Sequence, residues 1–472
     1  MAFSSLEFLY AFLPIVLFCY ALSPPAARNG LILVASLAFY AWTENRYTSV
    51  LLVYIVANWA FGRAIERSEL GSASRRRLVA GAVLANLSGL VIFKYTGFLA
   101  SNIDHFFPNV VPHESAAWHM HLPIGISFFA FQGISYVVDV GRMQIKAAPS
   151  LITFGAYKAF FPQLIAGPIV RYKDVAADFA TQQMPSSDDI AAGIRRFAVG
   201  LAKKVLIANS LAVPADSVFG APPGTVSAAM IWYGVLCYAL QLYFDFSGYS
   251  DMAIGLGRVF GIRIRENFVY PYLASSVRDF WQRWHISLSS WFRDYVYIPL
   301  GGSRAGRIRT TINLCVVFLL CGLWHGAQWT FVAWGAWHGA FLAVEHWTRR
   351  SGASSQDRRL FRSVAAHVYT ALVVLIGWVL FRSATLTQAG DLLTVMFSTR
   401  AASGAAPLWL DLANGQAVAA LAAAMVGSTE WGRHVAQGWS VGMRNVAAIA
   451  AFVVATIVLA SSAFNPFIYF RF

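Results

Sequence analysis

The chain has 472 residues, of which 58% are hydrophobic and 12% are charged. Soluble globular proteins carry about 25% charged residues, so this composition excludes an ordinary water-soluble domain. Apolar runs of the roughly 20 residues that cross a bilayer core recur along the whole sequence. Together these features predict an all-α polytopic membrane protein with about a dozen spans, arranged as a single membrane domain over residues 1–472.

The formal net charge is +14, and the basic residues fall in short loops between the apolar runs. This placement favours a membrane topology and argues against nucleic acid as a partner. Five, nine and five arginines lie in residues 63–77, 257–309 and 347–362, whereas residues 100–122 and 211–227 contain no lysine or arginine. Because cytoplasmic loops are rich in Lys and Arg, we place the rich loops in the cytoplasm and the N-terminus outside.

In chain order, the apolar stretch Leu6–Ala21 is the first predicted span, and Leu78–Tyr95 is the span that follows the first basic loop. Two later segments, Leu151–Gly167 and Ser287–Leu300, are apolar enough to enter the membrane. Both are too short or too interrupted by polar residues and proline to be ordinary spans. We predict that they are re-entrant or interfacial helices buried in protein.

A polar cluster at residues 241–251 lies within an apolar run and contains two carboxylates, Asp245 and Asp251. Carboxylates at membrane depth need partners. We expect structural ion pairs for both, in preference to catalysis, with partners among the arginines of residues 257–309.

Charged and aromatic residues alternate from Arg278 to Tyr295. One interpretation is an amphipathic interfacial helix. The other is the mouth of a polar cavity in which Arg283 and Arg293, beside Trp284, meet the phosphates of an acyl donor, since guanidinium groups pair well with phosphate.

Three histidines, His285, His325 and His338, lie in or beside apolar segments. His325 follows a run without charged residues, so its imidazole needs a polar partner or a tunnel. A neutral imidazole suits general-base catalysis near neutral pH, and a packing role is the alternative. Gly326 and the apolar residues after it predict a sharp turn between two helices, which leaves the separation of His325 and His338 open.

The sequence contains four cysteines, without a CxxC pair or a histidine at metal-ligand spacing. We predict inert thiols and no metal site. GxSxG, Walker and HExxH motifs are also absent from the sequence, which argues against an ordinary hydrolase, an ATPase and a zinc protease.

Five segments together resemble the membrane-bound O-acyltransferase (MBOAT) family, and within it the bacterial alginate O-acetyltransferase branch, which is related to the D-alanyltransferase of teichoic acid modification. They are FPQLIAGPI at 161–169, YFDFSGYSD at 243–251, RWHISLS continuing to WFRDYVYIPLGG at 283–302, LWHG at 323–326 and NPFIYF at 465–470. Any one of them is weak, but the set covers most of the chain.

The resemblance implies a ring of about 11–12 transmembrane helices, with re-entrant helices, around a central tunnel. It also implies that His325 is the catalytic histidine and that His285 is a second, tunnel-lining position, which many eukaryotic relatives fill with asparagine. No role carries over to His338. The aromatic tail at residues 463–472 resembles the terminal motif of the D-alanylation system, which implies that its tyrosine, here Tyr469, is an acyl relay. An aromatic residue at the membrane interface is the alternative for Tyr469.

The resemblance therefore predicts an O-acetyltransferase in a bacterial inner membrane that passes acetyl groups from a cytoplasmic donor to an exported, alginate-like polysaccharide. The expected donor is acetyl-CoA, with no bound cofactor, and His325 activates the acceptor hydroxyl. The expected partners are the donor, membrane lipid, the polysaccharide and a periplasmic acetyltransferase that completes the reaction. The alternatives are transfer of D-alanine or another acyl group to a cell-wall polymer and, more distantly, an ion-coupled transporter, although the inverted repeats of many transporters are not evident.

Overall fold

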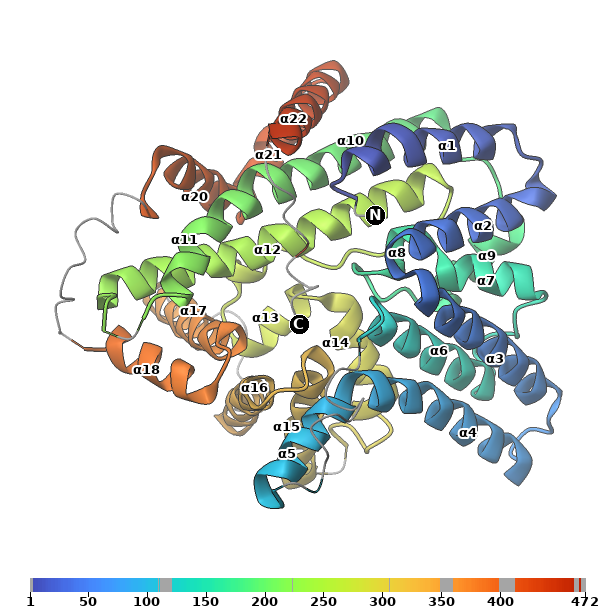
Figure 1. The fold of residues 1–472 in the computed structure, drawn as a ribbon, viewed down its shortest axis with the longest axis horizontal. Coiled ribbons are helices and arrows are strands. Elements are labelled where there is room, and N and C mark those ends of the chain that lie inside the picture. Colours follow the sequence, from blue (N-terminus) through green and yellow to red (C-terminus); the bar gives the residue numbers. More distant parts are fainter. Residues whose placement is uncertain are drawn as a thin grey trace. The chain divides into compact units, whose positions relative to one another are not determined.

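The computed structural model describes residues 3–108, 110, 121–222, 224–304, 306–348, 360–398, 412–461 and 467. Within these residues every regular element is a helix (Figure 1). The chain forms two compact units, the first from Met1–Phe197 with Tyr249–Arg265 and the second from Ala198–Gly248 with Glu266–Phe472. The predicted single domain over 1–472 stays a prediction.

The first unit contains helices from the N-terminal half of the chain. They are η1 (Phe8–Phe12), α1 (Leu13–Leu22), α2 (Pro25–Glu44), η2 (Asn45–Tyr47), α3 (Thr48–Arg67), α4 (Ala73–Leu90), η3 (Val91–Tyr95), α5 (Thr96–Phe106), α6 (Ile126–Gly141), α7 (Leu151–Ala159), α8 (Phe161–Leu164) and α9 (Tyr172–Thr181). Helices α10 (Ser187–Ala202) and α12 (Ala228–Val259) contribute to both units.

Helix α6 is buried along almost its whole length, and it packs against α3 and α4. Asn58 of α3 and Asn86 of α4 exchange side-chain hydrogen bonds of 3.0 and 2.8 Å. Gly133 of α6 lies against both amides, and a Cβ at this position would come within 2.3 Å of Asn86 Oδ1. A small residue on α6 thus allows a polar contact to join three apolar helices.

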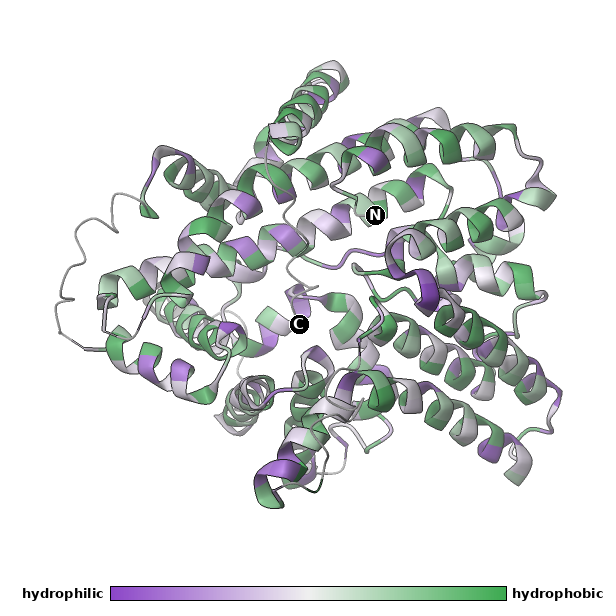
Figure 2. Cartoon of the chain, in the orientation of Figure 1, coloured by the Kyte–Doolittle hydropathy of each residue, from purple (hydrophilic) through white to green (hydrophobic). Residues whose placement is uncertain are grey.

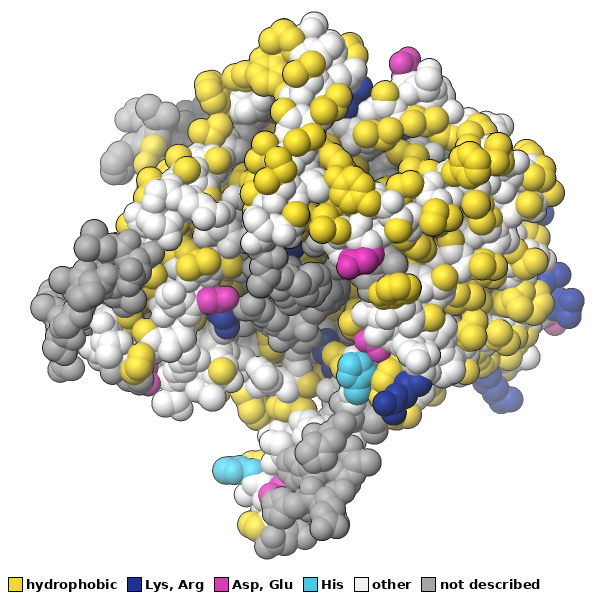
Figure 3. Space-filling model, turned by 45° about the horizontal axis from the view of Figure 1, so that its top comes forward, with side chains coloured by type: hydrophobic (Ala, Val, Ile, Leu, Met, Phe, Trp, Pro, Cys, Tyr) yellow, Lys and Arg dark blue, Asp and Glu magenta, His cyan; other side chains and the backbone are white. Residues whose placement is uncertain are grey.

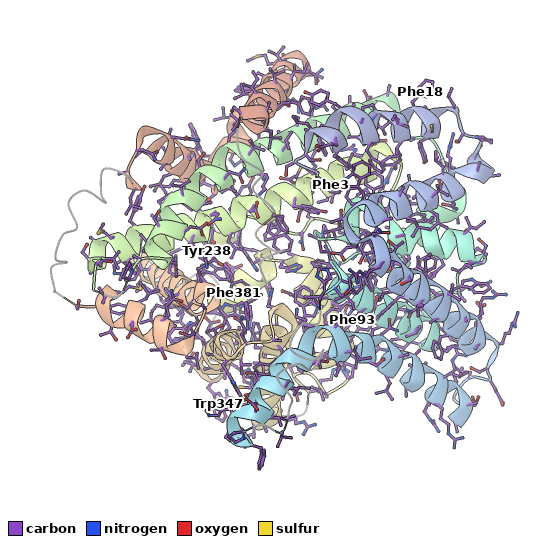
Figure 4. The ribbon with its side chains drawn as sticks, in the orientation of Figure 1. Phe3, Phe18, Phe93, Tyr238, Trp347 and Phe381 are labelled. Atoms are coloured by element: carbon purple, nitrogen blue, oxygen red, sulfur yellow. The ribbon has the colours of Figure 1, made fainter. Side chains whose placement is uncertain are left out.

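Aromatic side chains fill the core of the first unit beside α8. Phe3 stacks on Tyr249 and lies close to Phe39 and Phe161. Figure 4 labels Phe3, which is 1% exposed, and also Phe18, which is 67% exposed on the outer side of α1. One face of α1 is therefore apolar and uncovered, as expected for a helix that faces lipid.

The second unit contains the C-terminal half and all three histidines of interest. Its helices are η5 (Lys203–Ala208), α11 (Asn209–Phe219), η6 (Pro271–Leu273), α13 (Val277–Arg283), α14 (Ile286–Phe292), η7 (Arg293–Tyr297), α15 (Gly306–His325), α16 (Trp329–Thr348), α17 (Leu360–Arg382), α18 (Leu386–Met396), α20 (Gly415–Gly427), α21 (Trp431–Gln437) and α22 (Val441–Ser461).

Six helical stretches within the described residues are long and apolar enough to cross a membrane: Pro25–Arg67, Ala73–Phe106, Ser187–Phe219, Gly306–His325, Val364–Arg382 and Val441–Ser461. The helices are predominantly hydrophobic (Figure 2), and hydrophobic side chains cover much of the face in Figure 3. The predicted all-α polytopic membrane protein is thus confirmed. The count of 11–12 spans and the ring around a tunnel stay predictions.

The two segments predicted to be re-entrant form short helices. Residues 151–167 contain α7 and α8, and a bend at Phe160 separates them. Residues 287–300 contain most of α14 and the single π-helical turn η7. At about 1.5 Å per residue, none of these helices is long enough to cross a bilayer core.

Candidate active site

His325 is the last residue of α15 and is 6% exposed. Its ring lies 5.1 Å from that of Trp334 on α16 and 5.2 Å from that of Phe381 on α17, measured between centroids. Figure 4 labels Phe381 on its helix. Three helices of the second unit therefore enclose His325 in aromatic surface, which limits its contact with water.

Helices α15 and α16 form a tight hairpin that places His325 at its turn, as the sequence predicted from Gly326. A Cβ at Gly322 would come within 2.2 Å of the carbonyl oxygen of Phe331, and one at Gly335 within 2.3 Å of that of Phe318. At both positions the backbone of the other helix lies where a Cβ would be, so only glycine fits. The hairpin brings Trp334 beside both His325 and His338, with ring centroids 5.1 Å apart in each pair.

His285 lies between α13 and α14 and is fully buried. Its φ of 44° places it in the left-handed region, which asparagine, aspartate and histidine enter more readily than other side chains. Its Nδ1 lies 3.3 Å from Oδ1 of Asn267 and 3.4 Å from Oγ of Ser287. Burial lowers the pKa of His285 to about 3, so its imidazole is neutral at physiological pH.

Trp324 connects the two histidines named from the family resemblance. Its ring centroid lies 6.1 Å from that of His285 and 4.9 Å from that of His325. The two histidines are 40 positions apart in the sequence, and both contact one indole in the second unit.

His338 occupies a different environment on α16. It is fully buried, and its Nδ1 accepts a hydrogen bond of 3.3 Å from the indole N–H of Trp281. A Cβ at Gly377 of α17 would come within 2.8 Å of its Nε2. The ring is therefore wedged between neighbouring helices, as expected for a packing role.

A pocket of about 340 Å³ opens beside α13, α14 and α15 in the second unit. Its polar lining includes Arg278, Gln282, Ser289, Ser290, Arg293 and Tyr297. Trp281 and Cys321 belong to its apolar wall. Cys321 and His325 are four residues apart on α15 and so share one face of that helix. The pocket thus combines two guanidinium groups with an apolar wall one helical turn from His325.

The three residues predicted to bind the donor lie in different places. Arg293 lines the pocket. Arg283 pairs with Asp279 at 2.8 Å, and Trp284 is 3% exposed and stacks on Phe280. Neither Arg283 nor Trp284 belongs to the pocket lining, so a direct contact of these two with the donor stays a prediction.

Both carboxylates of the cluster at residues 241–251 form ion pairs. Asp245 pairs with Lys204 at 2.6 Å in the second unit, where both side chains are buried. Asp251 pairs with Arg196 at 2.8 Å in the first unit. These cations precede the cluster in the chain, whereas the sequence suggested arginines from residues 257–309. A Cβ at Gly248 of α12 would come within 2.7 Å of the carbonyl oxygen of Gly200.

The predicted relay Tyr469, and the tail at residues 463–472 apart from Phe467, lie outside the described residues. Phe467 is 3% exposed, and its ring lies 5.8 Å from that of Phe246. Phe246 in turn contacts His285, with ring centroids 4.7 Å apart. Phe467 is therefore connected to His285 through the ring of Phe246.

Sequence reasoning missed several residues of the site, among them Arg278, Asn267 and Trp334. Arg278 stands in the charged stretch already singled out, one turn before Trp281 and Gln282. Helical spacing would have placed these three residues on one face, and this was the signal that could have identified Arg278. Asn267 lies 18 positions before His285 in an irregular segment, and no local pattern links the two.

Within the described residues, no group of three or more His, Cys, Asp or Glu side chains is placed to hold a metal ion.

Comparison with known proteins bears on the chemistry of this arrangement. Residues 117–387 match the sequence model of the membrane-bound O-acyltransferase family. A probable alginate O-acetylase of Azotobacter vinelandii is 42% identical over 84% of this chain and 78% of its own length. A peptidoglycan O-acetyltransferase of Helicobacter pylori is 36% identical over 82% of this chain and 78% of its own. A teichoic acid D-alanyltransferase of Bacillus subtilis is 28% identical over 64% of this chain and 76% of its own.

The matched residues include all three histidines, the α15–α16 hairpin and the pocket. The family resemblance found in the sequence is thereby confirmed. This chain belongs to the membrane-bound O-acyltransferase family and is a multi-pass membrane acyltransferase.

Proposed function

We propose that this chain is an O-acetyltransferase of a bacterial inner membrane that moves acetyl groups from a cytoplasmic donor for the O-acetylation of an exported, alginate-like polysaccharide. The observation that carries the proposal is the contact of Trp324 with both His285 and His325. The names of the relatives support the acetyl group, since two of the three compared are O-acetylating enzymes.

His325 is the proposed general base. Its neutral imidazole takes the proton of the acceptor hydroxyl as the oxygen attacks the thioester carbonyl of acetyl-CoA. The tetrahedral intermediate then collapses, the C–S bond breaks, and the imidazolium returns the proton to the departing thiolate. The aromatic enclosure by Trp324, Trp334 and Phe381 supports this role because it keeps water from competing for the acetyl group.

The pocket is the proposed donor site. Arg293 and Arg278 supply guanidinium groups suited to the phosphates of acetyl-CoA, and Trp281 and Cys321 supply apolar surface for its pantetheine arm. The arginine distribution supports a cytoplasmic location for this region and an N-terminus outside. His285, which is neutral and buried, is proposed to orient the thioester or to share the proton.

The first acceptor on the far side is proposed to be Tyr469 or a periplasmic acetyltransferase that passes the group to the polysaccharide. The packing of Phe467 on Phe246, beside His285, supports an acceptor in the tail. A phenol relay of this kind would be covalent catalysis, in which Tyr469 carries an acetyl ester between two transfers.

The test is acetylation of the secreted polysaccharide in cells with the wild-type protein, His325→Ala or His338→Ala at matched membrane levels. We expect His325→Ala to lower acetylation by at least 100-fold with polymer yield intact, since general bases contribute about 10²–10⁴-fold. His338→Ala is the matched control, because it removes another buried imidazole that contacts Trp334. Acetylation retained in His325→Ala would overturn the assignment, and D-alanine on the polymer instead of acetyl would favour the D-alanyltransferase alternative.

A further inference from the structure

We infer that Asn267 is a positioning residue for the proposed transfer: it holds His285 in the tautomer that carries hydrogen on Nδ1 and leaves a lone pair on Nε2. The inference rests on the proposed function for its catalytic meaning, although the tautomer itself follows from geometry within the second unit. Asn267 is 1% exposed and lies in the irregular segment before η6.

The orientation of the Asn267 amide is fixed by a backbone group. The N–H of Ser287 donates a hydrogen bond of 3.0 Å to Oδ1 of Asn267. A backbone N–H has no lone pair to offer, so a flipped amide would place an NH₂ group against another donor. The atom that faces Ser287 is therefore the carbonyl oxygen.

The same oxygen determines which nitrogen of His285 carries hydrogen. Nδ1 of His285 lies 3.3 Å from Oδ1 of Asn267, and an amide oxygen only accepts hydrogen bonds. Nδ1 must therefore donate. The hydroxyl oxygen of Ser287, 3.4 Å away, is a second acceptor for the same hydrogen. A neutral imidazole carries one N–H, so Nε2 of His285 holds the lone pair.

The free lone pair lies in an apolar setting. Nε2 of His285 is buried and has no hydrogen-bond partner within the described part of the chain. In the described structure the groups that contact His285 are uncharged: Phe246, Phe268, Trp324, Asn267 and Ser287. A buried acceptor without a donor costs about 1–3 kcal/mol, and a hydroxyl or thiol proton of a substrate would satisfy it.

Asn267 also fixes the direction of the ring through the backbone. Its carbonyl oxygen accepts a hydrogen bond of 3.0 Å from the N–H of Ile286. Asn267 thus binds three consecutive residues, 285–287, at the point where the chain takes a left-handed conformation. A left-handed residue persists only where its surroundings determine it, and these three bonds do so for His285.

His338 provides an internal contrast. Its Nδ1 accepts from the indole N–H of Trp281, which can only donate. His338 therefore carries its hydrogen on Nε2, opposite to His285. The two fully buried histidines of this unit are held in opposite tautomers by two different neighbours.

The tautomers are measured directly by solid-state NMR on the full-length protein labelled with ¹⁵N-histidine in lipid. The signals of His285 and His338 are assigned by their loss in His285→Asn and His338→Asn. We expect the hydrogen on Nδ1 for His285 and on Nε2 for His338, both at pH 7. Hydrogen on Nε2 of His285 would overturn the inference, whether or not the protein transfers acetyl groups.

The positioning role is tested by pH profiles of acetyl transfer at matched membrane levels. Asn267→Asp replaces the amide with a carboxylate of the same shape, which stabilises the imidazolium of His285. We expect it to move the acid limb of kcat/KM upward by at least one pH unit, with activity recovered in alkali. Asn267→Ala should lower kcat/KM at least tenfold at every pH. Ser287→Ala, which keeps the backbone N–H, should have a kcat/KM within threefold of wild type.

If Asn267→Asp and Asn267→Ala lose the same amount of activity and both keep the wild-type pH profile, Asn267 has only a packing role. Lack of acetyl transfer by the wild-type protein under the same conditions would instead reject the proposed function. If Asn267→Ala fails to accumulate in the membrane, the isosteric Asn267→Asp variant and the NMR measurement on the wild-type protein still decide the inference.

Discussion

The indole N–H of Trp281 donates a hydrogen bond of 3.3 Å to Nδ1 of His338. His338→Phe would keep the ring volume but leave this buried N–H without its acceptor, which costs about 1–3 kcal/mol. We expect a lower melting temperature in detergent and acetyl transfer per folded protein within threefold of wild type. Loss of transfer at an unchanged melting temperature would instead place His338 in the chemistry.

The two pocket arginines should set the affinity for a phosphorylated donor. We expect Arg278→Ala and Arg293→Ala each to raise KM for acetyl-CoA about tenfold, since charge-assisted hydrogen bonds contribute about 1.5–3 kcal/mol. The value of kcat should change less, because the phosphates lie away from the reacting carbonyl. Arg283→Ala is the matched control, since Arg283 stands on the same helix as Arg278 but does not line the pocket. Equal effects of all three variants on KM would argue against the pocket.

Cys321 offers a chemical probe of the same pocket. In a variant that keeps only this cysteine, after serine replacement of Cys19, Cys237 and Cys315, we expect a small maleimide to label the pocket wall slowly. Acetyl-CoA should slow that labelling several-fold, as measured by intact-protein mass spectrometry.

The control for the labelling is a variant that keeps only Cys315, which lies on α15 but outside the pocket lining. Protection of Cys315 to the same degree would show that the donor changes the whole helix. If saturating acetyl-CoA does not protect Cys321, the pocket is not the donor site.

Acid should destabilise the second unit through His285. In the unfolded chain its imidazole takes up a proton below about pH 6.5, whereas in the folded chain burial lowers the pKa to about 3. The stability gained from the neutral form is thus complete above pH 6.5 and is lost as the pH falls toward 3. Between pH 7 and pH 5 the loss is on the order of 2 kcal/mol.

The measurement is the melting temperature in detergent at pH 7 and pH 5 for the wild type and His285→Asn. We expect the drop between the two pH values to be smaller in the variant, because asparagine does not titrate. An identical drop in both proteins would show that other groups account for the acid sensitivity.

Much of the fold could be predicted from local pattern. An apolar run indicated the membrane-crossing helix over Ala73–Phe106, whereas the predicted first span, Leu6–Ala21, forms only the shorter apolar helix Phe8–Leu22. Gly326 indicated the turn after His325, because the conformational effect of glycine is local. The sites that depend on tertiary packing could not be predicted in this way. Arg278 and Arg283 look equivalent in the sequence, but α13 has only seven residues, and its packing decides that Arg278 faces the pocket. The pairing of Asp245 with Lys204 likewise depends on how α12 meets η5.

The left-handed backbone at His285 also limits how this position can vary during evolution. Besides glycine, the residues that adopt a left-handed conformation most readily are asparagine, aspartate and histidine. Aspartate would bring a charge into the apolar surroundings of this position, and glycine would provide no polar side-chain atom. Histidine and asparagine are then the two residues that satisfy both the backbone and the site, and these are the two that the family resemblance associates with this position. The main chain thus restricts this position to these two residues before any substrate binds.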